Sequence, residues 1–556
     1  MATGLLNISL SGLNAATSGI RTVQQNIANA NTEGYRRQQA VFSAAPPQYS
    51  GGGYLGTGVQ VDTVRRIYDQ FLNSQTQNYQ TQLSSSQAYA AYATQVDALL
   101  GSDATGLSIS LQNFFSSISE VANDPTSLTA RQQMLSTADS LATRFNLLSS
   151  NLLGIKSTIN QDVATAAEQI NRYADQIKNL NAQITRALGS GQTPNDLLDQ
   201  RDQLVTELNK LVNVSQIQQS DGSIAVMLGR GQPLVVGSSV RHVVAVNDPA
   251  DTTQMTLAME VPGSATPEVI DVSDITGGRL GGLFAFRSDV LAPSIADLDL
   301  MAQGLADAFN AQHVAGYDLN GNAGLDFFSY SATSPSGTLA VAISQPALIA
   351  AASEGVVTAA SAGNTGDASI GYATLSTELT RPLADAPYTL TYDAGSNSIT
   401  VTDATAATLG SYTYTSGSAI SFNGISVVIT DGPAGIANGD SFTVDNSGAS
   451  AGPGDGSNAL ALAGLRSQAV VAGSSVSGYN IAMIGRNATY ANTADTNAAN
   501  FTSLYKQSFD ALQSVSGVNL DEEAVSLIQY QQAYQAAAKA IQTSSVLFDA
   551  ILGVIR

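Results

Sequence analysis

The 556-residue chain contains no cysteine and only two histidines. Without cysteine it has neither a disulfide framework nor a thiolate that binds a metal or attacks a substrate. His242 and His313 stand far apart in the sequence, and neither belongs to an HExxH pattern, so a zinc peptidase is unsupported. We expect each histidine to have a structural or surface role.

Charged residues are also scarce, at 12% of the chain, which is about half the usual share. Alanine, serine, threonine, glycine and amides take their place, a composition typical of surfaces that meet other protein but also compatible with a β-rich secreted protein. The net charge of -21 argues against nucleic acid or an anionic membrane as partner, because both require a basic patch. The longest basic clusters are the pairs Arg36-Arg37 and Arg65-Arg66.

Long apolar runs are absent as well. The first residues, MATGLLNISLSGLNAATSG, carry no positive segment and no continuous apolar stretch, so we do not expect a Sec-type signal peptide. No stretch of about 18 apolar residues suggests a membrane span. We therefore expect a protein that is either cytoplasmic or exported by a route that reads another signal.

Three motif matches fail on their context. GASAG at 448–452 matches a nucleophile elbow around Ser450, but it lies in a loose Gly/Pro/Ser linker. YDLNGNAGLDFF at 317–328 has Ala323 and Ser329 where a calcium loop starting at Asp318 needs glycine and an acid, which favours a polar turn. The glycine pairs of TGGRLGGLF precede what we predict to be a strand, so they do not form a phosphate-binding loop.

The two ends of the chain carry heptad patterns of the coiled-coil kind with almost no charge. Between Leu5 and Thr32 the only charged residue is Arg21, and between Ala524 and Phe548 it is Lys539. A lone surface helix carries charges on its outer face, so we expect both ends to be surrounded by each other and by copies of the chain. The predicted interface positions are Leu6, Leu13, Ile20, Ile27, Leu520, Leu527, Tyr534, Ile541 and Phe548.

Helical patterns also fill about 68–212 and return after the linker ASAGPGDGSN. The stripe from Ile159 to Ala187 steps four and three throughout, which indicates a coiled-coil seam buried within the chain. The segment PNDLLDQRDQLVTELNKLV predicts a helix with Pro194 in its first turn and Leu197, Leu204, Leu208 and Leu211 on one side. Asn519 and Glu522 predict a capping box at the start of the last helix.

Alternating patterns predict strands from about Val214 to Arg287 and in a second block, 333–448, where YTLTYDAGSNSITVTD indicates a hairpin. We therefore predict a multidomain α+β protein. The predicted domains are a terminal coiled-coil domain (1–40 plus 516–556), a mainly helical middle domain (41–212 plus 286–332 plus 454–515), and two inserted β-rich domains (213–285 and 333–453).

The paired terminal heptads, with ANANTEGY closing the first of them, resemble the axial proteins of the bacterial flagellum. PNDLLDQRD, SGVNLDEEA and LGGLFAFRSDVL resemble the hook-associated proteins among these, and specifically those that join hook to filament. The block 333–448 matches this pattern least well.

The resemblance implies a non-enzymatic structural subunit without cofactor or metal, exported unfolded through the flagellar type III channel and folded on assembly. Its implied partners are itself in a ring or tube, the hook protein, the third hook-associated protein and a flagellar export chaperone, with no nucleic acid and no membrane insertion. The chaperone would mask Leu527, Tyr534, Ile541 and Phe548. The implied location is extracellular, at the hook–filament junction, and cytoplasmic before export.

Two alternatives stay open at this point. One is another axial subunit, such as flagellin or the third hook-associated protein. The other is a surface adhesin whose β-rich blocks bind host ligands, which would need a conventional secretion signal or an anchor.

Overall fold

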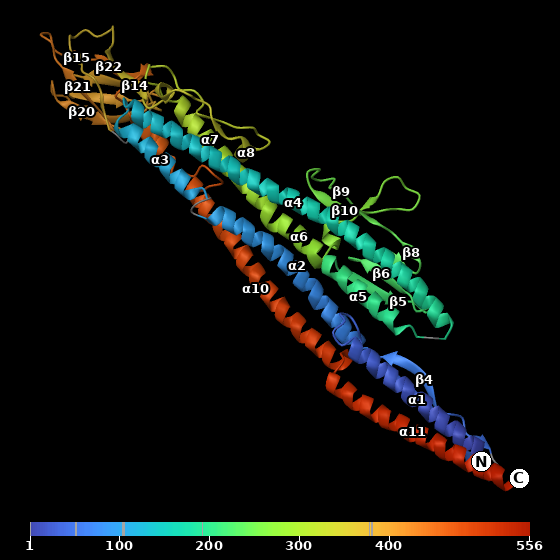
Figure 1. The fold of residues 1–556 in the computed structure, drawn as a ribbon. Helices are drawn as coiled ribbons and strands as arrows, with labels where there is room; N and C mark the ends of the chain where they lie inside the picture. Colours follow the sequence, from blue (N-terminus) through green and yellow to red (C-terminus); the bar gives the residue numbers. More distant parts are fainter. Residues whose placement is uncertain are drawn as a thin grey trace. The chain divides into compact units, whose positions relative to one another are not determined.

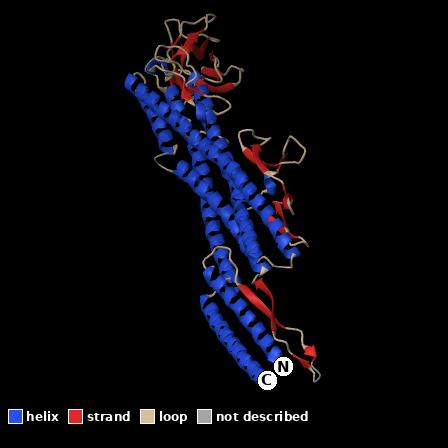
Figure 2. Ribbon diagram, turned by 45° about the vertical axis from the view of Figure 1, so that its right-hand side comes forward, coloured by secondary structure: helices blue, strands red, loops and turns tan. Residues whose placement is uncertain are grey.

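The computed structural model describes residues 2–49, 53–102, 106–191, 193–376, 379 and 382–555. Helices and several small sheets alternate along the chain (Figures 1 and 2). The chain divides into two compact units, residues 1–94, 155–289 and 490–556 in the first and residues 95–154 and 290–489 in the second. The division falls within three long helices, α2 (Gln70–Gly101), α4 (Leu128–Gly189) and α10 (Val476–Ser516).

The two ends of the chain lie together in the first unit. Helix α1 (Ala2–Ala28) and helix α11 (Leu520–Ile555) run side by side, with both termini at the same end of the pair (Figure 1). A twisted antiparallel hairpin of β1 (Gln38–Ala44) and β4 (Val59–Arg66) packs on α1. Its outer end carries the short strands β2 (Gln48–Tyr49) and β3 (Tyr54–Leu55).

The predicted seam of α4 is confirmed as an internal core. Ile159, Val163, Ile170, Ile177 and Ile184 are fully buried, because the stripe faces other elements of the chain. The next helix, α5 (Asn195–Leu211), is also confirmed, but it begins one residue after Pro194.

Two small sheets of the first unit follow α5, as the alternating pattern predicts. Their central strands are the most buried, with Ile224, Ala225 and Val226 buried in one sheet and Leu257, Ala258 and Met259 in the other. The first sheet has the order β5 (Val214–Gln218), β6 (Ile224–Leu228), β7 (Gln232–Val236), β8 (Ser239–Val240). The second has the order β11 (Glu268–Val269), β10 (Met255–Met259), β9 (Val243–Asn247), and a 3-10 turn, η1 (Val272–Asp274), follows it.

The strand predicted at TGGRLGGLF is wrong, because this segment forms helix α6 (Gly278–Phe286). Glycine disfavours a helix in isolation, but here it allows close packing. A Cβ at Gly282 would lie 2.1 Å from the backbone oxygen of Ser85, and one at Gly278 would lie 2.5 Å from the backbone nitrogen of Val212. Tertiary contact therefore overrides the local preference.

The second unit has a helical part built around an aromatic cluster. Phe114, Phe309, Phe327 and Phe328 are buried against one another, with ring centroids 4.8 to 6.3 Å apart. The elements are α3 (Ser108–Asn123), a π-helical turn η2 (Arg287–Leu291) that begins in the first unit, α7 (Ala292–Val314), β12 (Phe328–Ser329), α8 (Pro335–Thr338), β13 (Ala340–Val341), η3 (Pro346–Leu348) and α9 (Ser457–Gly464).

The second unit also contains the predicted second block of strands, which has its own core. Leu390, Val401, Val427 and Phe442 are completely buried in it. A five-stranded sheet has the order β14 (Glu354–Ala360), β22 (Ser441–Ser450), β17 (Tyr388–Asp393), β18 (Ser398–Thr402), β19 (Thr408–Thr413). The other strands are β15 (Ser369–Ile370), β16 (Thr374–Leu375), β20 (Ala419–Phe422) and β21 (Ile425–Thr430).

The hairpin predicted from YTLTYDAGSNSITVTD is confirmed as β17 and β18. Asn397 in its turn has a φ of 47°, a left-handed conformation that asparagine tolerates better than most residues. Across the described helices, none combines the length and the hydropathy that a membrane span requires.

Candidate assembly site

The first component of the site is the seam between α1 and α11, which pack antiparallel. A Cβ built at Gly12 would lie 3.8 Å from the Cβ of Ala537, and one at Gly19 would lie 2.7 Å from the ring of Tyr530. The Tyr530 ring therefore rests directly on the backbone of Gly19. One heptad further along α1, the side chain of Asn26 donates a hydrogen bond to Glu523.

The predicted stripe residues are only partly covered within one chain. Leu6 and Ile27 on α1 are 40% and 37% exposed, and Leu520 and Tyr534 on α11 are 53% and 41% exposed. The other stripe residues whose side chains are described (Leu13, Ile20, Leu527 and Ile541) are half-buried, and the side chain of Phe548 lies outside the described residues. Within one chain the closest seam contacts join Gly12 to Ala537 and Gly19 to the Tyr530 ring, and the apolar stripe residues stay partly or largely open to solvent.

The exposed apolar surface of these two helices is wider than the predicted stripe. Leu5, Ile8 and Leu10 on α1 are each at least 40% exposed. On α11 the same holds for Val525, Ile528, Val546 and Leu547. Exposed apolar residues on several sides of a helix are typical of a surface that meets protein.

Asn26 is the centre of a buried polar cluster at the base of the seam. Its side-chain oxygen accepts hydrogen bonds from the hydroxyl of Tyr35 (2.8 Å) and the backbone nitrogen of Gln38 (2.9 Å). Its side-chain nitrogen donates to the backbone oxygen of Gln38 (2.9 Å) and to Glu523 (3.0 Å). All four hydrogen-bonding sites of the amide group are used, which fixes its orientation.

Arg37 completes this cluster from the segment that leads into β1. Its Nε donates to Glu523 at 2.8 Å and its Nη1 to Glu522 at 2.7 Å. The Glu523 side chain is 2% exposed whereas that of Glu522 is 57% exposed. We call Asn26, Arg37 and Glu523 the clasp, because they join segments from opposite ends of the sequence.

The predicted capping box at Asn519 is confirmed in one half only. The side-chain oxygen of Asn519 accepts from the backbone nitrogens of Asp521 (3.0 Å) and Glu522 (3.4 Å), as a cap does. The Glu522 carboxylate, which would return a hydrogen bond in a full box, is paired with Arg37 instead.

Arg36, the neighbour of Arg37, points to α5. Its backbone nitrogen donates to Asp199, and its guanidinium lies over the ring of Tyr68 at 4.7 Å. Arg66 at the end of β4 covers the same ring at 4.6 Å and donates to Asp199 (3.0 Å) and Asp202 (2.7 Å). Successive side chains of an extended chain point in opposite directions. Arg36 therefore contacts α5 while Arg37 contacts α11, and both helices are connected to the same short segment.

Burial raises the pKa of the Asp199 carboxyl to about 6, and the contacts with Arg66 and Arg36 counter this only in part. Burial alone would lower the pKa of Arg66, but its contacts with Asp202 and Asp199 raise it overall. Because arginine stays charged, the ion pair between Arg66 and Asp199 depends on the ionisation of Asp199, which is half complete near pH 6 and increases above it. Burial, followed by Asp196, Asp199 and Glu523, also raises the pKa of Tyr35, which keeps its hydroxyl a donor.

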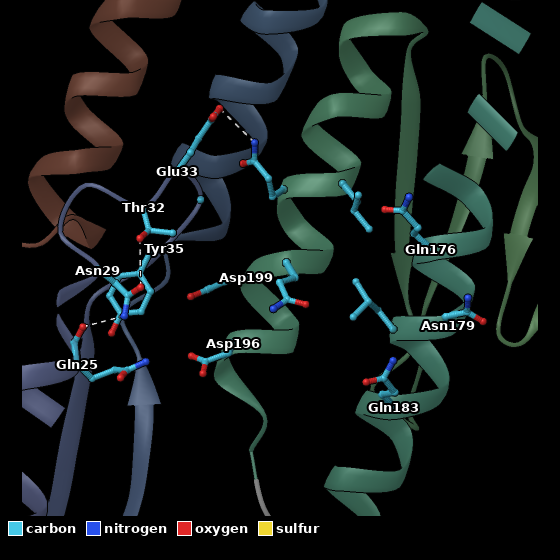
Figure 3. Close-up of a pocket in the computed structure, with 15 residues that line it drawn as sticks. Gln25, Asn29, Thr32, Glu33, Tyr35, Gln176, Asn179, Gln183, Asp196 and Asp199 are labelled. Atoms are coloured by element: carbon cyan, nitrogen blue, oxygen red, sulfur yellow. Dashed lines mark hydrogen bonds between the residues drawn. The ribbon is translucent and has the colours of Figure 1, made fainter. Parts of the chain in front are cut away.

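A polar groove of about 600 Å³ lies beside this cluster, between the end of α1, α4 and α5 (Figure 3). Gln25, Asn29, Thr32, Glu33 and Tyr35 line one wall, and Gln176, Asn179, Gln183, Asp196 and Asp199 line the others. Amides dominate this lining, and no histidine or lysine belongs to it. The groove therefore offers mainly hydrogen-bonding groups, together with the carboxylates of Glu33, Asp196 and Asp199.

The buried charges of α5 were missed by the sequence reasoning. The leucine spacing correctly predicted the helix, with Leu208 and Leu211 buried, while Leu197 and Leu204 are half-buried. Asp199, Arg201 and Asp202 are also buried, since their partners come from distant parts of the chain. The repeated aspartates of PNDLLDQRD were the feature of the sequence that could have indicated these buried ion pairs.

The other candidates of the sequence have structural roles. His313 is buried and accepts from the backbone nitrogen of Ala350, and His242 lies at the surface between Asp175 and Glu260. Asp318 accepts hydrogen bonds from two backbone nitrogens of its own turn. Ser450 ends strand β22 rather than standing between a strand and a helix. Within the described residues, no three acidic or histidine side chains form a metal site.

Comparison with known proteins places this chain in a flagellar class. Residues 93–328 match the model of the helical domain of the flagellar hook-associated protein FlgK, and residues 512–554 match that of the C-terminal region of the basal body rod FlgEFG proteins. These matches define a structural, non-enzymatic component of the flagellum.

Relatives that match over the full length of the chain identify the family more narrowly. Flagellar hook-associated protein 1 of Salmonella typhimurium is 35% identical over 99% of both chains, and that of Escherichia coli is 33% identical over the same shares. The flagellar hook junction protein FlgK of Burkholderia pseudomallei has a similar structure, with a TM-score of 0.65 and 26% identity over 80% of this chain and all of that one. The chain belongs to the flagellar hook-associated protein 1 family.

Proposed function

We propose that the chain is the structural subunit that forms the junction between hook and filament. The observation that carries this proposal is the paired α1 and α11, whose apolar side chains, such as Leu5, Leu10, Val525 and Ile528, are about half exposed to solvent. Burying such side chains is worth about 1.5–3 kcal/mol each. Copies of the same pair supply the missing neighbours.

In this proposal residues 1–40 and 516–556 form a discontinuous coiled-coil assembly domain. The helical middle domain comprises 41–212, 286–332 and 454–515, and the β-rich domains comprise 213–285 and 333–453. The contact between α1 and α11 supports the first of these, because it joins segments from opposite ends of the sequence. The assembly interface comprises Leu6, Leu13, Ile20, Ile27, Leu520, Leu527, Tyr534, Ile541 and Phe548.

The proposed life cycle follows from the family. The chain leaves the cytoplasm unfolded through the flagellar type III channel, and its ends fold on assembly at the outside of the cell. Before export a chaperone covers Leu527, Tyr534, Ile541 and Phe548. Afterwards the partners are further copies of the chain, the hook protein on one side and the third hook-associated protein on the other.

Electron microscopy of isolated flagella tests this proposal, with an antibody raised against residues 333–448. We expect label in a narrow band between hook and filament. Label along the whole filament would instead make the chain a filament subunit. Label on the cell body alone would favour an adhesin, and either result would overturn the junction role.

A further inference from the structure

The apolar part of the α1–α11 seam does not by itself select one alignment of the two helices. Gly12 and Gly19 are one heptad apart, and so are Tyr530 and Ala537. If α11 slid by one heptad along α1, Tyr530 would rest on Gly12 instead of Gly19, and Ala537 would lie beside Leu5. A glycine would again receive the tyrosine ring, so the packing of α11 on α1 itself distinguishes the two registers poorly, although the edge contact of Tyr530 with Phe42 of β1 would be lost.

The clasp distinguishes them. Glu523 is 1% exposed and accepts from Asn26 at 3.0 Å and from Arg37 at 2.8 Å. In the shifted register Glu523 would face Gly19, which has no side chain to donate. A buried carboxylate without partners is strongly unfavourable, so this register is excluded by charge rather than by shape.

Asn26 is ready to receive Glu523 only after its own neighbours have folded. Its oxygen is held by Tyr35 and the backbone of Gln38, so the segment from Tyr35 to Gln38 must already lie against the end of α1. Arg37, the second donor, belongs to the same segment. The local contacts of Asn26 with Tyr35 and Gln38 therefore form first, and the contacts between the two ends of the chain form second.

We propose that Glu523 is the residue that fixes the register of α11 on α1. Because Glu523 accepts hydrogen bonds from Asn26 and Arg37, the last helix can dock only after the segment 35–38 has folded. This inference rests on the proposed function in one respect, namely that the α1–α11 pair is the element through which the chain assembles. A single polar pair that sets the register of a helix seam is a known device in coiled coils. Here its two sides come from opposite ends of one chain.

Introduced cysteines read the register directly, because the chain has none of its own. The pair Gly12→Cys and Ala537→Cys reports the observed register, since the two Cβ positions are 3.8 Å apart, within the range of a disulfide. The pair Leu5→Cys and Ala537→Cys reports the shifted one. In the observed register Leu5 lies one heptad from Gly12, roughly 10 Å along the helix, and cannot form that bond.

The experiment compares the rates of the two cross-links under mild oxidation in isolated flagella, where the ends of the chain are folded. Glu523→Gln is expected to lower the ratio of observed to shifted cross-link by at least about tenfold. Asn26→Leu, which removes the donor and keeps the carboxylate, is expected to lower it in the same direction.

Glu522→Gln is the matched control. It removes the same charge from the same helical turn and from the same arginine, but its side chain is exposed, so the ratio should stay within about twofold. Equal ratios in all variants would overturn the proposal. Loss of both cross-links in Glu523→Gln would also overturn it, since Glu523 would then hold the helices together without selecting a register.

The outcome is independent of the junction role, because the cross-links form within one chain. Antibody label along the filament would overturn the proposed function and leave the register measurement intact. Conversely, label at the junction with unchanged cross-link ratios would overturn the register inference alone.

Discussion

The buried imidazole of His313 links the second unit to pH. Its Nε2 accepts from the backbone nitrogen of Ala350 at 2.9 Å, so Nδ1 carries the proton and donates to the backbone oxygen of Leu325 at 2.6 Å. Burial lowers the pKa of His313 to about 4, because the cation would lose its hydration. The folded chain therefore holds this histidine neutral at pH values where an unfolded chain protonates it.

We expect the stability of the second unit to fall as the pH drops below the unfolded value of about 6.5 towards 4. In this window the unfolded state binds the extra proton, so stability is full above it, and the loss reaches about 3 kcal/mol at its lower end. Hydrogen exchange of the α7 amides measures the loss. His313→Gln should show a shallower pH dependence, and the surface variant His242→Gln should retain that of the parent. Equal slopes in the parent and His313→Gln would contradict this assignment.

Two glycines in helices should respond to alanine with opposite signs. At Gly282 the methyl group would lie 2.1 Å from the backbone oxygen of Ser85, so we expect a loss of about 1–3 kcal/mol. At Gly154, an exposed position inside α4, the methyl group meets no atom within 4 Å, so we expect a gain of about 0.5–1 kcal/mol. Thermal unfolding of both variants measures the difference. Stabilisation by Gly282→Ala would show that α6 does not approach α2 so closely.

At the scale of elements, α11 has one side that packs on α1 in a defined register and other sides that expose apolar residues without a defined partner position. The seam carries the polar clasp at one end, whereas exposed valine, leucine, isoleucine and tyrosine side chains cover its other sides. Under the proposed function, the seam aligns the two helices within one chain and the apolar surface contacts other chains.

A charge on this surface should block assembly without unfolding the rest of the chain. We expect Ile541→Lys to reduce the number of full-length filaments at least about tenfold, because burying an unpaired ammonium group is strongly unfavourable. Leu153→Lys, the same type of change at an exposed leucine of α4, is the control and should assemble normally. Electron microscopy of cells that carry only the variant chain counts the filaments. A normal count for Ile541→Lys would refute the interface.

The helices were largely predictable from sequence, but their polar contacts were not. Heptad and alternating patterns predicted α1, α4, α11 and the β17–β18 hairpin, because each depends on spacing within one segment. The pairing of Glu523 with Asn26, or of Asp199 with Arg66, depends on which distant segments meet. Helix α6 was missed for the same reason, since its glycines make sense only beside α2 and α5.

At the scale of the whole molecule, the block from β14 to β22 behaves as an insertion. Its first and last strands are paired, with Glu354 opposite Ser450, so the chain enters and leaves at one place. Its apolar residues form a core of their own between two sheets. Such an insertion folds without depending on its host.

Removal of this block should therefore leave the helices intact. We expect a chain in which residues 355–449 are replaced by a two-residue turn to keep its helical signal, with the midpoint of thermal unfolding shifted by no more than about 5 °C. Circular dichroism of this chain measures whether the helices remain folded, and circular dichroism of the isolated segment 354–450 measures whether the strands fold alone. Removal of 355–400 alone is the control, because it cuts through the core and should leave the remaining strands unfolded. Loss of helix in the first variant would show that the block supports its host.

The opposite directions of Arg36 and Arg37 have an evolutionary consequence. A substitution in the segment from Tyr35 to Gln38 disturbs the contacts of one side chain, but the insertion or deletion of a single residue beside the two arginines would exchange their faces and separate each from its acidic partners. Natural selection should therefore tolerate changes of composition in this segment more readily than changes of length. Length variation among homologues is expected instead around β2 and β3 at the outer end of the β1–β4 hairpin, because the residues of these two strands are exposed.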